Sequence, residues 1–531
     1  MMGYAPVKMA DVRVRTNSTT TTDFELPMTV IEGEEVVVTV DAISQVKDQT
    51  SSVRNISSDA ISVLPVESTS QIVELQAGVV DGHFRGGRSN EVTYMIDGVN
   101  VNDTFNSGRM VDVETEVIED IEVILGTFNA EYGRAMSGVV NAVTKEGGNR
   151  FDGFVSAQLG NYYTTRNDIF IGLKPGQVDR KTNFRAQLSG PIFRDKLTFL
   201  ANYRYRDEAN QFNGIHRFNP YDYSDFSSPD SANWYSEHSG NDSYVPMGTQ
   251  NSHSFYGKLT LKPFANFKAS LVANIGLSEN KGYNHYMKYN PKGVASNHNE
   301  NYSYTLMFNH TLSQRLFHEL KISYVDNTYE RYLYEDPNDP RYVSEWYGQE
   351  ALTGFSTGGQ DKAFNQSNSI KTDAKYDITW QVTNHHSLKA GFLYTEQDRD
   401  VANYRIVNRY RNNDQLNLFQ DTTWTETGEI AKISYPFFEP TLLDDSTTAA
   451  DVYSKTPVEF SAYLQDKMEF DDLVMNFGVR YDYFDPQTVY PTNLRNPANQ
   501  LSYPNNPERL SDYPSAPAQT QVSPRFGLAY T

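Results

Sequence analysis

The chain has 531 residues and a large acidic excess, with 67 Asp and Glu against 46 Lys and Arg and a formal net charge of −21. This balance argues against a nucleic-acid partner, because nucleic acids are bound through clustered positive charge. The sequence contains no cysteine, which excludes thiol catalysis and cysteine-ligated metal sites. An oxidising compartment is compatible with that absence but is not required by it.

Hydropathy restricts how the chain could meet a membrane. The mean hydropathy is −0.60, and no apolar run approaches the ~18 residues of a membrane helix. The protein is therefore either soluble or a β-barrel, whose apolar face is hidden in alternation. The 36 Tyr and 29 Phe favour a barrel with aromatic girdles. Met1–Pro6 lacks the features of a signal peptide, which an exported barrel would need, so we expect the natural N-terminus to lie upstream.

The first part of the chain predicts short β elements and connections. Residues 1–33 alternate weakly and predict the remnant of a small β-sandwich. Residues 34–42 have two interpretations: a last strand of that sandwich, or an extended peptide that a partner binds by strand addition. Ser44–Ser58 is rich in Ser, Thr and Asn and predicts a flexible linker. Val66–Leu75 predicts a helix that ends with Gly78 as its C-cap.

Residues 43–150 predict a small α+β domain punctuated by glycine. Val92–Ile96 is a predicted strand, followed by a two-residue turn at Asp97 and Gly98. Val139–Val143 is a further predicted strand, and Ile118–Leu125 is predicted to be a strand or a short helix that leads into one. The oxygen-bearing side chains from Asp97 onward also resemble a calcium loop, but the later acidic ligand is missing, which favours a plain turn.

Residues 151–531 alternate with a period of two over many segments, as in the strand pattern of Phe267–Leu277. Short links such as Lys262–Asn266 join strands in pairs, while long polar stretches such as Asp207–Gln250 separate the pairs. Strict alternation of short and long connections is typical of outer-membrane barrels. We expect about twelve strands of roughly ten residues, and we expect the barrel to continue beyond Thr531, since lipid does not tolerate open sheet edges.

Several stretches resemble TonB-dependent outer-membrane receptors, of the Oar-like and SusC-like branches. Arg85–Glu91 with Tyr94–Val99 is similar to the first plug motif of the family. Ile121–Ile124, Asn129–Gly133 and Ser137–Lys145 are similar to the second. The positions that the resemblance assigns to the plug motifs are Arg85, Gly86, Gly87, Arg88, Asp97, Gly98, Glu122, Asn129, Glu131, Tyr132, Gly133, Gly138 and Asn141.

The N-terminal segments also match the family pattern. Residues 1–33 resemble the end of a carboxypeptidase-regulatory-like domain. The segment at residues 34–42 resembles the TonB box. The residues that this resemblance assigns to TonB binding are Glu35, Val36, Val37, Val38, Thr39 and Val40.

The resemblance implies a mainly β protein in which an α+β plug at residues 43–150 sits inside a transmembrane antiparallel barrel. It implies energised uptake of a scarce or bulky ligand, of the siderophore, glycan or oligopeptide class. The implied partners are TonB of the TonB–ExbB–ExbD complex, outer-membrane lipids, an unknown extracellular ligand and a SusD-like lipoprotein. No cofactor or catalytic residue is implied.

One departure from the family concerns how the plug is held. Many members carry Arg-Gly after the strand corresponding to Ile121–Ile124, and an ion lock between plug and barrel is centred on that Arg. Leu125 and Gly126 stand there in this chain, so that lock is not expected.

Two alternatives to active import are an adhesive or secretion-associated Oar-like barrel and a soluble β-protein.

Overall fold

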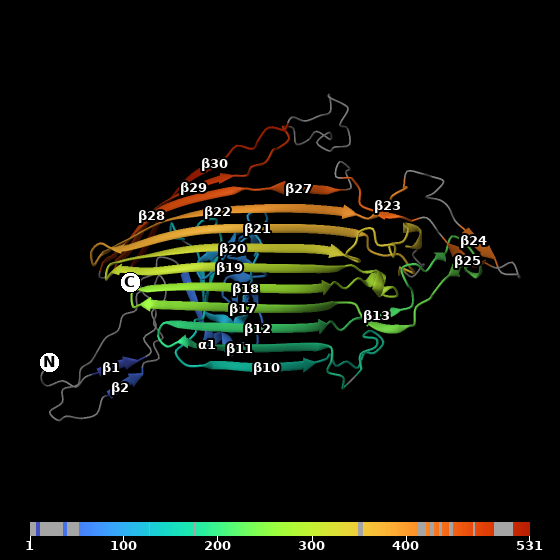
Figure 1. The fold of residues 1–531 in the computed structure, drawn as a ribbon, viewed down its shortest axis with the longest axis horizontal. Helices are drawn as coiled ribbons and strands as arrows, with labels where there is room; N and C mark the ends of the chain where they lie inside the picture. The colour runs from blue at the N-terminus through green and yellow to red at the C-terminus, as the bar shows by residue number, and fades with distance from the viewer. Residues whose placement is uncertain are drawn as a thin grey trace.

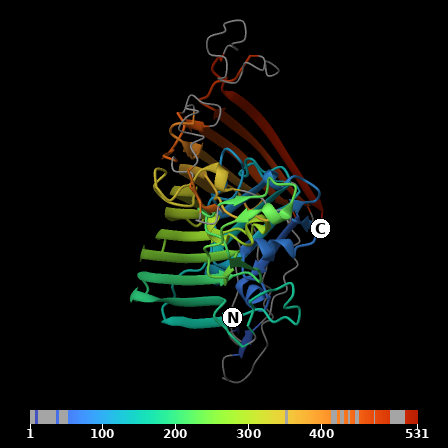
Figure 2. The same cartoon turned by 90° about the vertical axis from the view of Figure 1, so that its right-hand side faces the viewer.

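The computed structural model describes residues 7–10, 36–39, 52–126, 128–174, 176–348, 354–411, 421–424, 430–434, 438–444, 450–470, 473–492 and 513–530. Two sheets dominate these residues. A 13-stranded antiparallel sheet forms a long curved wall, and a five-stranded sheet belongs to a small domain in its hollow. Figure 1 shows the wall strands side by side, and Figure 2 shows the small blue domain on their concave side.

The wall strands follow one another in sequence order, which is the simplest antiparallel topology. They are β10 (Asp152–Gly160), β11 (Lys181–Phe193), β12 (Leu197–Ala209), β17 (Thr249–Phe264), β18 (Phe267–Lys281), β19 (Ser296–Ser313), β20 (Leu316–Tyr332), β21 (Ala363–Gln381), β22 (His386–Arg405), β28 (Val458–Phe470), β29 (Leu473–Asp485) and β30 (Gln519–Tyr530), with β27 (Asp451–Lys455) paired to β22. The expected strand number is confirmed. The expected length of about ten residues is wrong for most strands, because they run on toward the long connections and reach 20 residues in β22.

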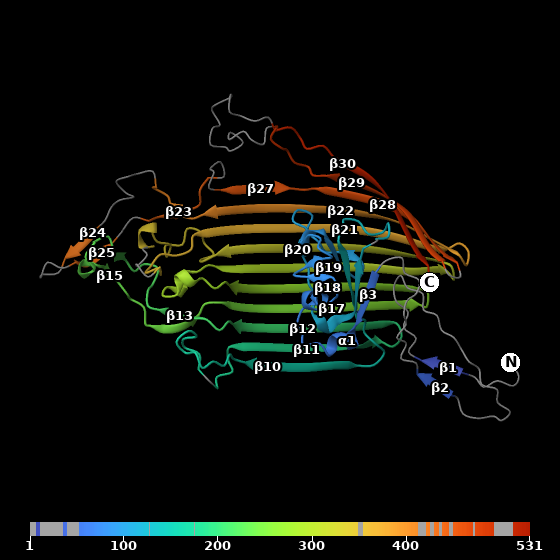
Figure 3. The ribbon, with the colours of Figure 1, turned by 180° about the vertical axis from the view of Figure 1, so that it is seen from behind.

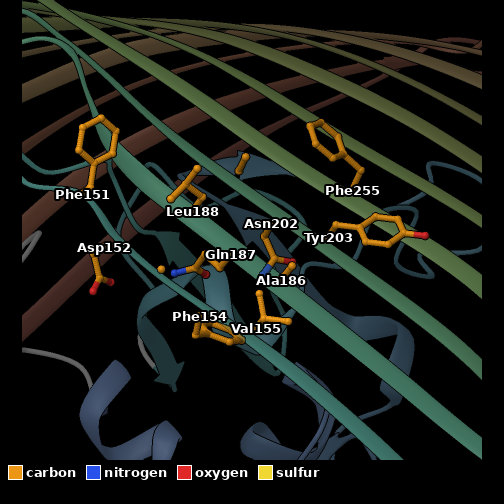
Figure 4. A pocket seen from close by; sticks show the side chains of 12 residues that line it. Phe151, Asp152, Phe154, Val155, Ala186, Gln187, Leu188, Asn202, Tyr203 and Phe255 are labelled. Atoms are coloured by element: carbon orange, nitrogen blue, oxygen red, sulfur yellow. The ribbon is translucent and has the colours of Figure 1, made fainter.

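The two faces of the wall differ as the alternation predicts. On β18, Leu271 is 47% exposed on the convex side, whereas its neighbour Ser270 is 2% exposed beneath the small domain. A shallow apolar groove of about 650 Å³ lies along β10–β12 and is lined in part by Phe151, Leu188 and Phe255 (Figure 4). An apolar outer face of this kind is what a strand wall needs against hydrocarbon.

Connections at the two ends of the wall differ in length, as expected. Residues 265–266 join β17 to β18, whereas residues 210–248 join β12 to β17. The expected turn at 471–472 lies outside the described residues. The long connections carry β13 (Asn213–His216), β14 (Ser224–Asp225), η3 (Ser231–Asn233), β15 (Tyr235–Ser236), β16 (Ser243–Pro246), η4 (His285–Met287), η5 (Pro291–Gly293), η6 (Glu345–Tyr347), β23 (Val407–Asn408), β24 (Asp421–Trp424), β25 (Ile430–Ser434) and β26 (Pro440–Thr441).

The small domain, called the plug from here on, is a mixed sheet with short helices. Its strands are ordered β3 (Ser52–Ser57), β8 (Ile118–Leu125), β9 (Gly138–Thr144), β6 (Val92–Ile96) and β7 (Val99–Asn100), with only β6 and β9 parallel. Around it lie α1 (Ser58–Ser62), α2 (Thr69–Glu74), β4 (Val79–Val80), β5 (His83–Phe84), η1 (Ser89–Glu91) and η2 (Thr115–Val117). The core packs Ile72, Phe84, Val117 and Ile121, all nearly inaccessible to solvent.

Two local predictions in the plug need correction. The end of the expected linker Ser44–Ser58 is strand β3 and the first residue of α1, because Ile56 is buried in the plug core and the polar residues around it fit an edge strand. The expected helix is shorter than Val66–Leu75. Ser68 caps its start, Leu75 caps its end, and Gly78, at φ +93, lies in the turn that leads to β4.

The N-terminal segment contributes a separate two-stranded sheet. β1 (Val7–Ala10) pairs in parallel with β2 (Val36–Thr39), and both lie at the end of the wall with the short connections (Figures 1 and 3). The rest of the expected β-sandwich at 1–33, together with Glu35 and Val40, lies outside the described residues. An extended β2 fits both interpretations of residues 34–42, so TonB binding there stays a prediction.

No helix in the described part of the chain has the length and apolar character to cross a membrane.

The strand wall generates the first test. Replacing Leu271 by Arg places a charge on the apolar face in mid-strand, which should lower the free energy of unfolding in phospholipid vesicles by about 2–4 kcal/mol. The measurement is urea unfolding followed by heat-dependent gel mobility.

The control is Glu279→Arg on the same strand and face but nearer the long connections. It should cost about 1 kcal/mol or less, because the penalty falls toward the interface. Equal effects of the two substitutions would contradict a lipid-facing wall.

Candidate functional site

The surface between plug and wall is the best-defined site in the molecule. Its apolar part is small: Leu200, Tyr256, Val272 and Met307 of the wall join the plug core. The remainder is polar, as the inward Ser, Thr, Asn and Lys residues predict. A plug bound mainly by polar contacts can exchange them for water at modest cost, unlike an apolar core.

Charge is distributed unequally across this surface. The plug supplies mainly carboxylates and the inner wall mainly cations. The pairs are Glu67 with Arg185 and Arg204, Asp97 with Lys258, Asp103 with Arg399, Glu114 with Arg204 and Arg206, Glu116 with Arg185, Glu131 with Lys389, and Glu146 with Lys262 and Lys268. The described residues contain a pair of opposite polarity in Arg134 of the plug and Glu459 of the wall.

Arg204 on β12 forms the first cluster. Its side chain is 1% exposed, and its guanidinium donates to Glu114 Oε2 at 2.8 Å and Glu67 Oε2 at 2.6 Å. Nε donates to Asn183 Oδ1 at 3.0 Å. A buried ion pair adds little net stability, but a buried charge that loses its partner without reaching water is strongly penalised. This cluster therefore fixes the position of the plug beside β11 and β12.

Asp97 forms the second cluster. It begins the predicted two-residue turn, and both turn residues have positive φ, +49 and +77, as a type I′ turn requires. Its carboxylate accepts from Thr144 N at 2.8 Å and Oγ1 at 2.5 Å, and lies 3.3 Å from Lys258 Nζ. Tyr256 Oη donates to Thr144 Oγ1 at 2.8 Å. Asp97 therefore closes the turn and joins the plug to β17. For the calcium-loop alternative, the described part of the chain contains no group of three or more His, Cys, Asp or Glu residues that could hold a metal ion.

The second plug motif forms the third cluster, against β22 and β29. Asn476 Nδ2 donates to Asn129 Oδ1 at 2.6 Å, and Lys389 pairs with Glu131. Arg480 Nη1 donates to the carbonyl oxygens of Ala130 and Glu131, each at 3.3 Å. A Cβ on Gly133 would collide with the Arg480 guanidinium, so a larger residue there would require Arg480 to move. Tyr132 is buried in the adjoining core.

Glu122 is a buried carboxyl group behind this cluster. It lies on β8 opposite Asn141 of β9 and is 5% exposed. Burial and then the neighbouring charge of Glu131 raise the pKa of Glu122 to about 7, against the opposing effect of Asn141. Asn141 also accepts from Gly98 N at 3.0 Å, so it connects Glu122 to the Asp97 turn.

The Arg85–Glu91 part of the first plug motif lies apart from the three clusters, whereas Asp97 of the same motif contacts the wall. Arg85 and Arg88 are exposed, and Arg85 Nη2 donates to Ser52 Oγ at 3.0 Å. Gly86 adopts φ +79 in this loop beside Gly87. Gly138 packs beneath the Phe84 ring, where a Cβ would not fit. These residues shape the plug itself. Leu125 is buried in the plug core, and the ion pairs above hold the plug without an Arg at that position.

Sequence reasoning missed most of the pairing residues. Glu67, Asp103, Glu114, Glu116 and Glu146 were not singled out in the plug, nor were their cationic partners in the wall. A signal was present, because Arg204 and Arg206 alternate with outward aromatic residues on β12. Charged residues at inward positions of consecutive strands would have predicted a charged lumen.

Two cavities open on the side of the long connections. One of about 370 Å³ lies between the plug loop around Asp103 and Arg109 and wall residues such as Tyr329 and Asn403. The other, about 930 Å³, lies among the connections near η4 and η6. Lys362 borders the second; burial lowers its pKa to about 8, against the opposing effect of Glu345. Both cavities have a size typical of ligand sites.

Family comparisons agree with this architecture. The model described as "Outer membrane beta barrel domain" matches residues 223–531, more than half of the chain. The model described as "TonB-dependent Receptor Plug Domain" matches residues 45–140. Fold and matches together define an outer-membrane β-barrel with an internal plug. The chain belongs to the TonB-dependent receptors, which confirms the resemblance to that family, the mainly β fold of plug and barrel, and an outer-membrane location. The carboxypeptidase-regulatory-like remnant at residues 1–33 stays a prediction.

Individual relatives match only in part. The TonB-dependent transporter Oar of Myxococcus xanthus is 32% identical over 146 residues, 26% of this chain and 14% of that protein. The vitamin B12 transporter BtuB of Vibrio vulnificus is 26% identical over 238 residues, 42% of this chain and 36% of that protein. The chain thus spans less than two thirds of these relatives.

Solved structures share the fold at low sequence identity. The ferric yersiniabactin uptake receptor FyuA of Yersinia pestis has a TM-score of 0.57 and 14% identity, covering 91% of this chain and 62% of that one. The transporter YddB of Escherichia coli has a TM-score of 0.54 and 13% identity, covering 90% and 58%.

The Asp97 cluster generates a prediction about plug retention. Asp97→Asn leaves Lys258, whose side chain is 4% exposed, without its carboxylate. We expect the plug to lose about 3 kcal/mol of stability against local unfolding, because the remaining buried charge is uncompensated. Hydrogen exchange of β6 and β9 in lipid nanodiscs measures this loss. Glu119→Gln, at an exposed position of β8, is the control and should leave exchange unchanged; equal protection in both variants would contradict the assignment.

Glu122 generates a prediction about pH. Its folded pKa of about 7 lies above the ordinary 4.5, so ionisation opposes folding. The penalty is absent below about pH 4.5, grows as the pH rises from about 4.5 to about 7, and keeps its full value above about 7. Glu122→Gln should therefore protect β8 and β9 relative to the native chain near pH 8, by at most about 3 kcal/mol.

The two proteins should differ little near pH 4, where the carboxyl is largely protonated in both the folded and the unfolded state. Hydrogen exchange corrected for the intrinsic effect of pH provides the measurement. Asp120, Glu131 and Lys389 act on the same carboxyl group and are unchanged in the variant. A difference that is independent of pH would show that the substitution acts through packing.

Proposed function

We propose that this receptor imports a ligand across the outer membrane with energy delivered by TonB. The polar plug–wall surface is the observation that carries the proposal. A plug held by hydrogen bonds and ion pairs keeps one orientation yet can be displaced without exposing a large apolar core. A purely structural stopper would gain more from apolar packing.

The arrangement of the ends supports the direction of transport. The long connections and both ligand-sized cavities lie at one end of the wall, which is the extracellular end in outer-membrane barrels. Strands β1 and β2 lie at the opposite end (Figure 1). A ligand arriving from outside would therefore meet Asp103 and Arg109 of the plug, while TonB would reach Glu35–Val40 from the periplasm.

TonB would bind this segment as an added strand of its own sheet, so backbone hydrogen bonds would supply most of the binding affinity. In the described residues β1 occupies one edge of β2, so TonB would either pair with the other edge or displace β1. Ligand binding at the plug loop and force from the plug's N-terminal side would act on the same small domain.

The siderophore and vitamin ligands named for the relatives are candidate classes for the cargo. Outer-membrane lipids around the wall and a SusD-like lipoprotein on the outer face are further proposed partners.

The segment assignment predicts the effect of a backbone change. Val38→Pro removes an N–H donor and restricts φ, so it should weaken binding of the periplasmic domain of TonB at least tenfold, about 1.4 kcal/mol. The measurement is biolayer interferometry with the full chain in nanodiscs.

Val38→Thr is the matched control, because it keeps the backbone donor and a β-branched side chain. It should bind like the native chain. Equal binding of the native chain and the Pro variant, or no binding by either, would count against TonB coupling and favour an adhesive or secretion-associated barrel.

A further inference from the structure

The inner face of the wall is divided into two zones along the strands. At the level of the plug it is charged, with Lys258, Lys371, Lys375 and Lys389 directed to the plug. Asn301 marks the upper limit, because its Nδ2 donates to Met110 O of the plug at 3.0 Å. Residues two and four positions beyond this level share the inward face, so the cross-strand register defines what lies above the plug.

Two registered rows of side chains cross the wall above Asn301. The first row is Ser252, Ser278, Asn299, Tyr329, Ser367 and Val401. The second row is Gln250, Asn280, Asn297, Arg331, Asn365 and Asn403. We call these two rows the amide face.

On these six strands the amide face presents almost no free charge, whereas the same rows continue to Arg206 and Glu208 on β12 and to Asp451 on β27. Its charged member, Arg331, pairs with Asp361. At its lower border Arg399 pairs with Asp103, and in the loop cavity Lys362 pairs with Glu345. The other polar members are amides and hydroxyls, which both donate and accept hydrogen bonds. Asn297 already uses both functions, donating to Asn280 Oδ1 at 2.9 Å and accepting from Tyr329 Oη at 3.0 Å.

Both cavities border on this face. Tyr329, Ser367 and Asn403 line the cavity of about 370 Å³ above the plug, together with Tyr453 of β27. Asn297 and Arg331 line the cavity of about 930 Å³ among the connections. A ligand passing from the outer cavity to the plug would therefore move along amides, hydroxyls and tyrosine rings.

We propose that the ligand of this receptor is an uncharged oligosaccharide, an inference that rests on the proposed uptake function. Sugar hydroxyls donate and accept as the amide face does, and tyrosine rings offer apolar surface to the sugar ring. Few charged groups need desolvation on either side, so neutral partners avoid the cost of burying unpaired ions.

Other ligand classes fit this lining less well. An anionic metal chelate needs uncompensated cations, whereas the named cations carry carboxylate partners and the whole chain has a net charge of −21. A peptide brings charged termini and binds best along a free strand edge. The backbone groups beneath the amide face are already used in the wall ladder.

The test is equilibrium binding to the full chain in lipid nanodiscs, with defined probes. The probes are an array of neutral oligosaccharides of four to eight units, an acidic oligosaccharide set, ferric citrate and an oligopeptide library. We expect neutral oligosaccharides to bind, and Asn403→Leu to weaken the best of them at least tenfold. Asn299→Leu is a second variant in case the first does not fold, with folding checked by heat-dependent gel mobility.

Asn338→Leu, at an exposed position between β20 and β21, is the matched control and should bind like the native chain. The proposal is overturned if no neutral oligosaccharide binds, if only charged probes bind, or if both amide-face variants fold and bind normally. Because this measurement needs no TonB, its failure is separate from failure of the Val38→Pro test, which needs no ligand.

Discussion

Ion pairing between an acidic plug and a cationic inner wall is the constraint on which the arrangement depends. Arg204 and Lys258 are almost inaccessible to solvent, and each would be an unpaired buried charge without a carboxylate from the plug. The plug in turn depends on the wall. Asp97 bonds to Thr144 of the plug and pairs with Lys258 of the wall, and Glu131 of the plug pairs with Lys389 of the wall. Each pair adds little net stability, but each penalises a displaced plug. The interaction therefore specifies one orientation without creating an apolar core that could not be opened.

The period-two alternation of the wall strands places side chains in three environments: the outer face, the inner face beside the plug and the inner face above the plug. Successive residues of a wall strand point to opposite faces, so Leu271 meets the outside while Ser270 lies under the plug. Along the inward face the chemistry changes again, from lysine and arginine beside the plug to amides and hydroxyls above it. A soluble β-sandwich also alternates, but it has no need for inward lysines. The charged lower zone thus separates a plugged barrel from other alternating β-proteins on physical grounds.

The sequence predicts what depends on local pattern. The alternation, the short and long connections, the Asp97–Gly98 turn and strands β6, β8 and β9 are all confirmed. Strand β3 was missed because its stabilising contact is Ile56 in a core assembled from distant residues. The pairing at the site could not be predicted, since Asn129 and Asn476 are 347 residues apart and meet only in the folded barrel. Asp97 was identified as a turn residue, yet its bond to Lys258 needed the wall.

The order of the elements determines how force from the N-terminal side would reach the plug. Strand β3 is the first strand of the plug in the chain and lies at the edge of the plug sheet, where among the described residues it pairs with β8 and is half exposed. Glu67 and its bonds to Arg185 and Arg204 follow directly. Asp97 and Glu131 lie deeper, on or beside central strands that pair on both sides. Strands at an edge separate with fewer broken bonds than strands in the centre, so the pairs beside β11 and β12 would open while those beside β17 and β22 still hold. A plug anchored in this way can open along one side of the lumen and keep its remaining contacts as the template for closing.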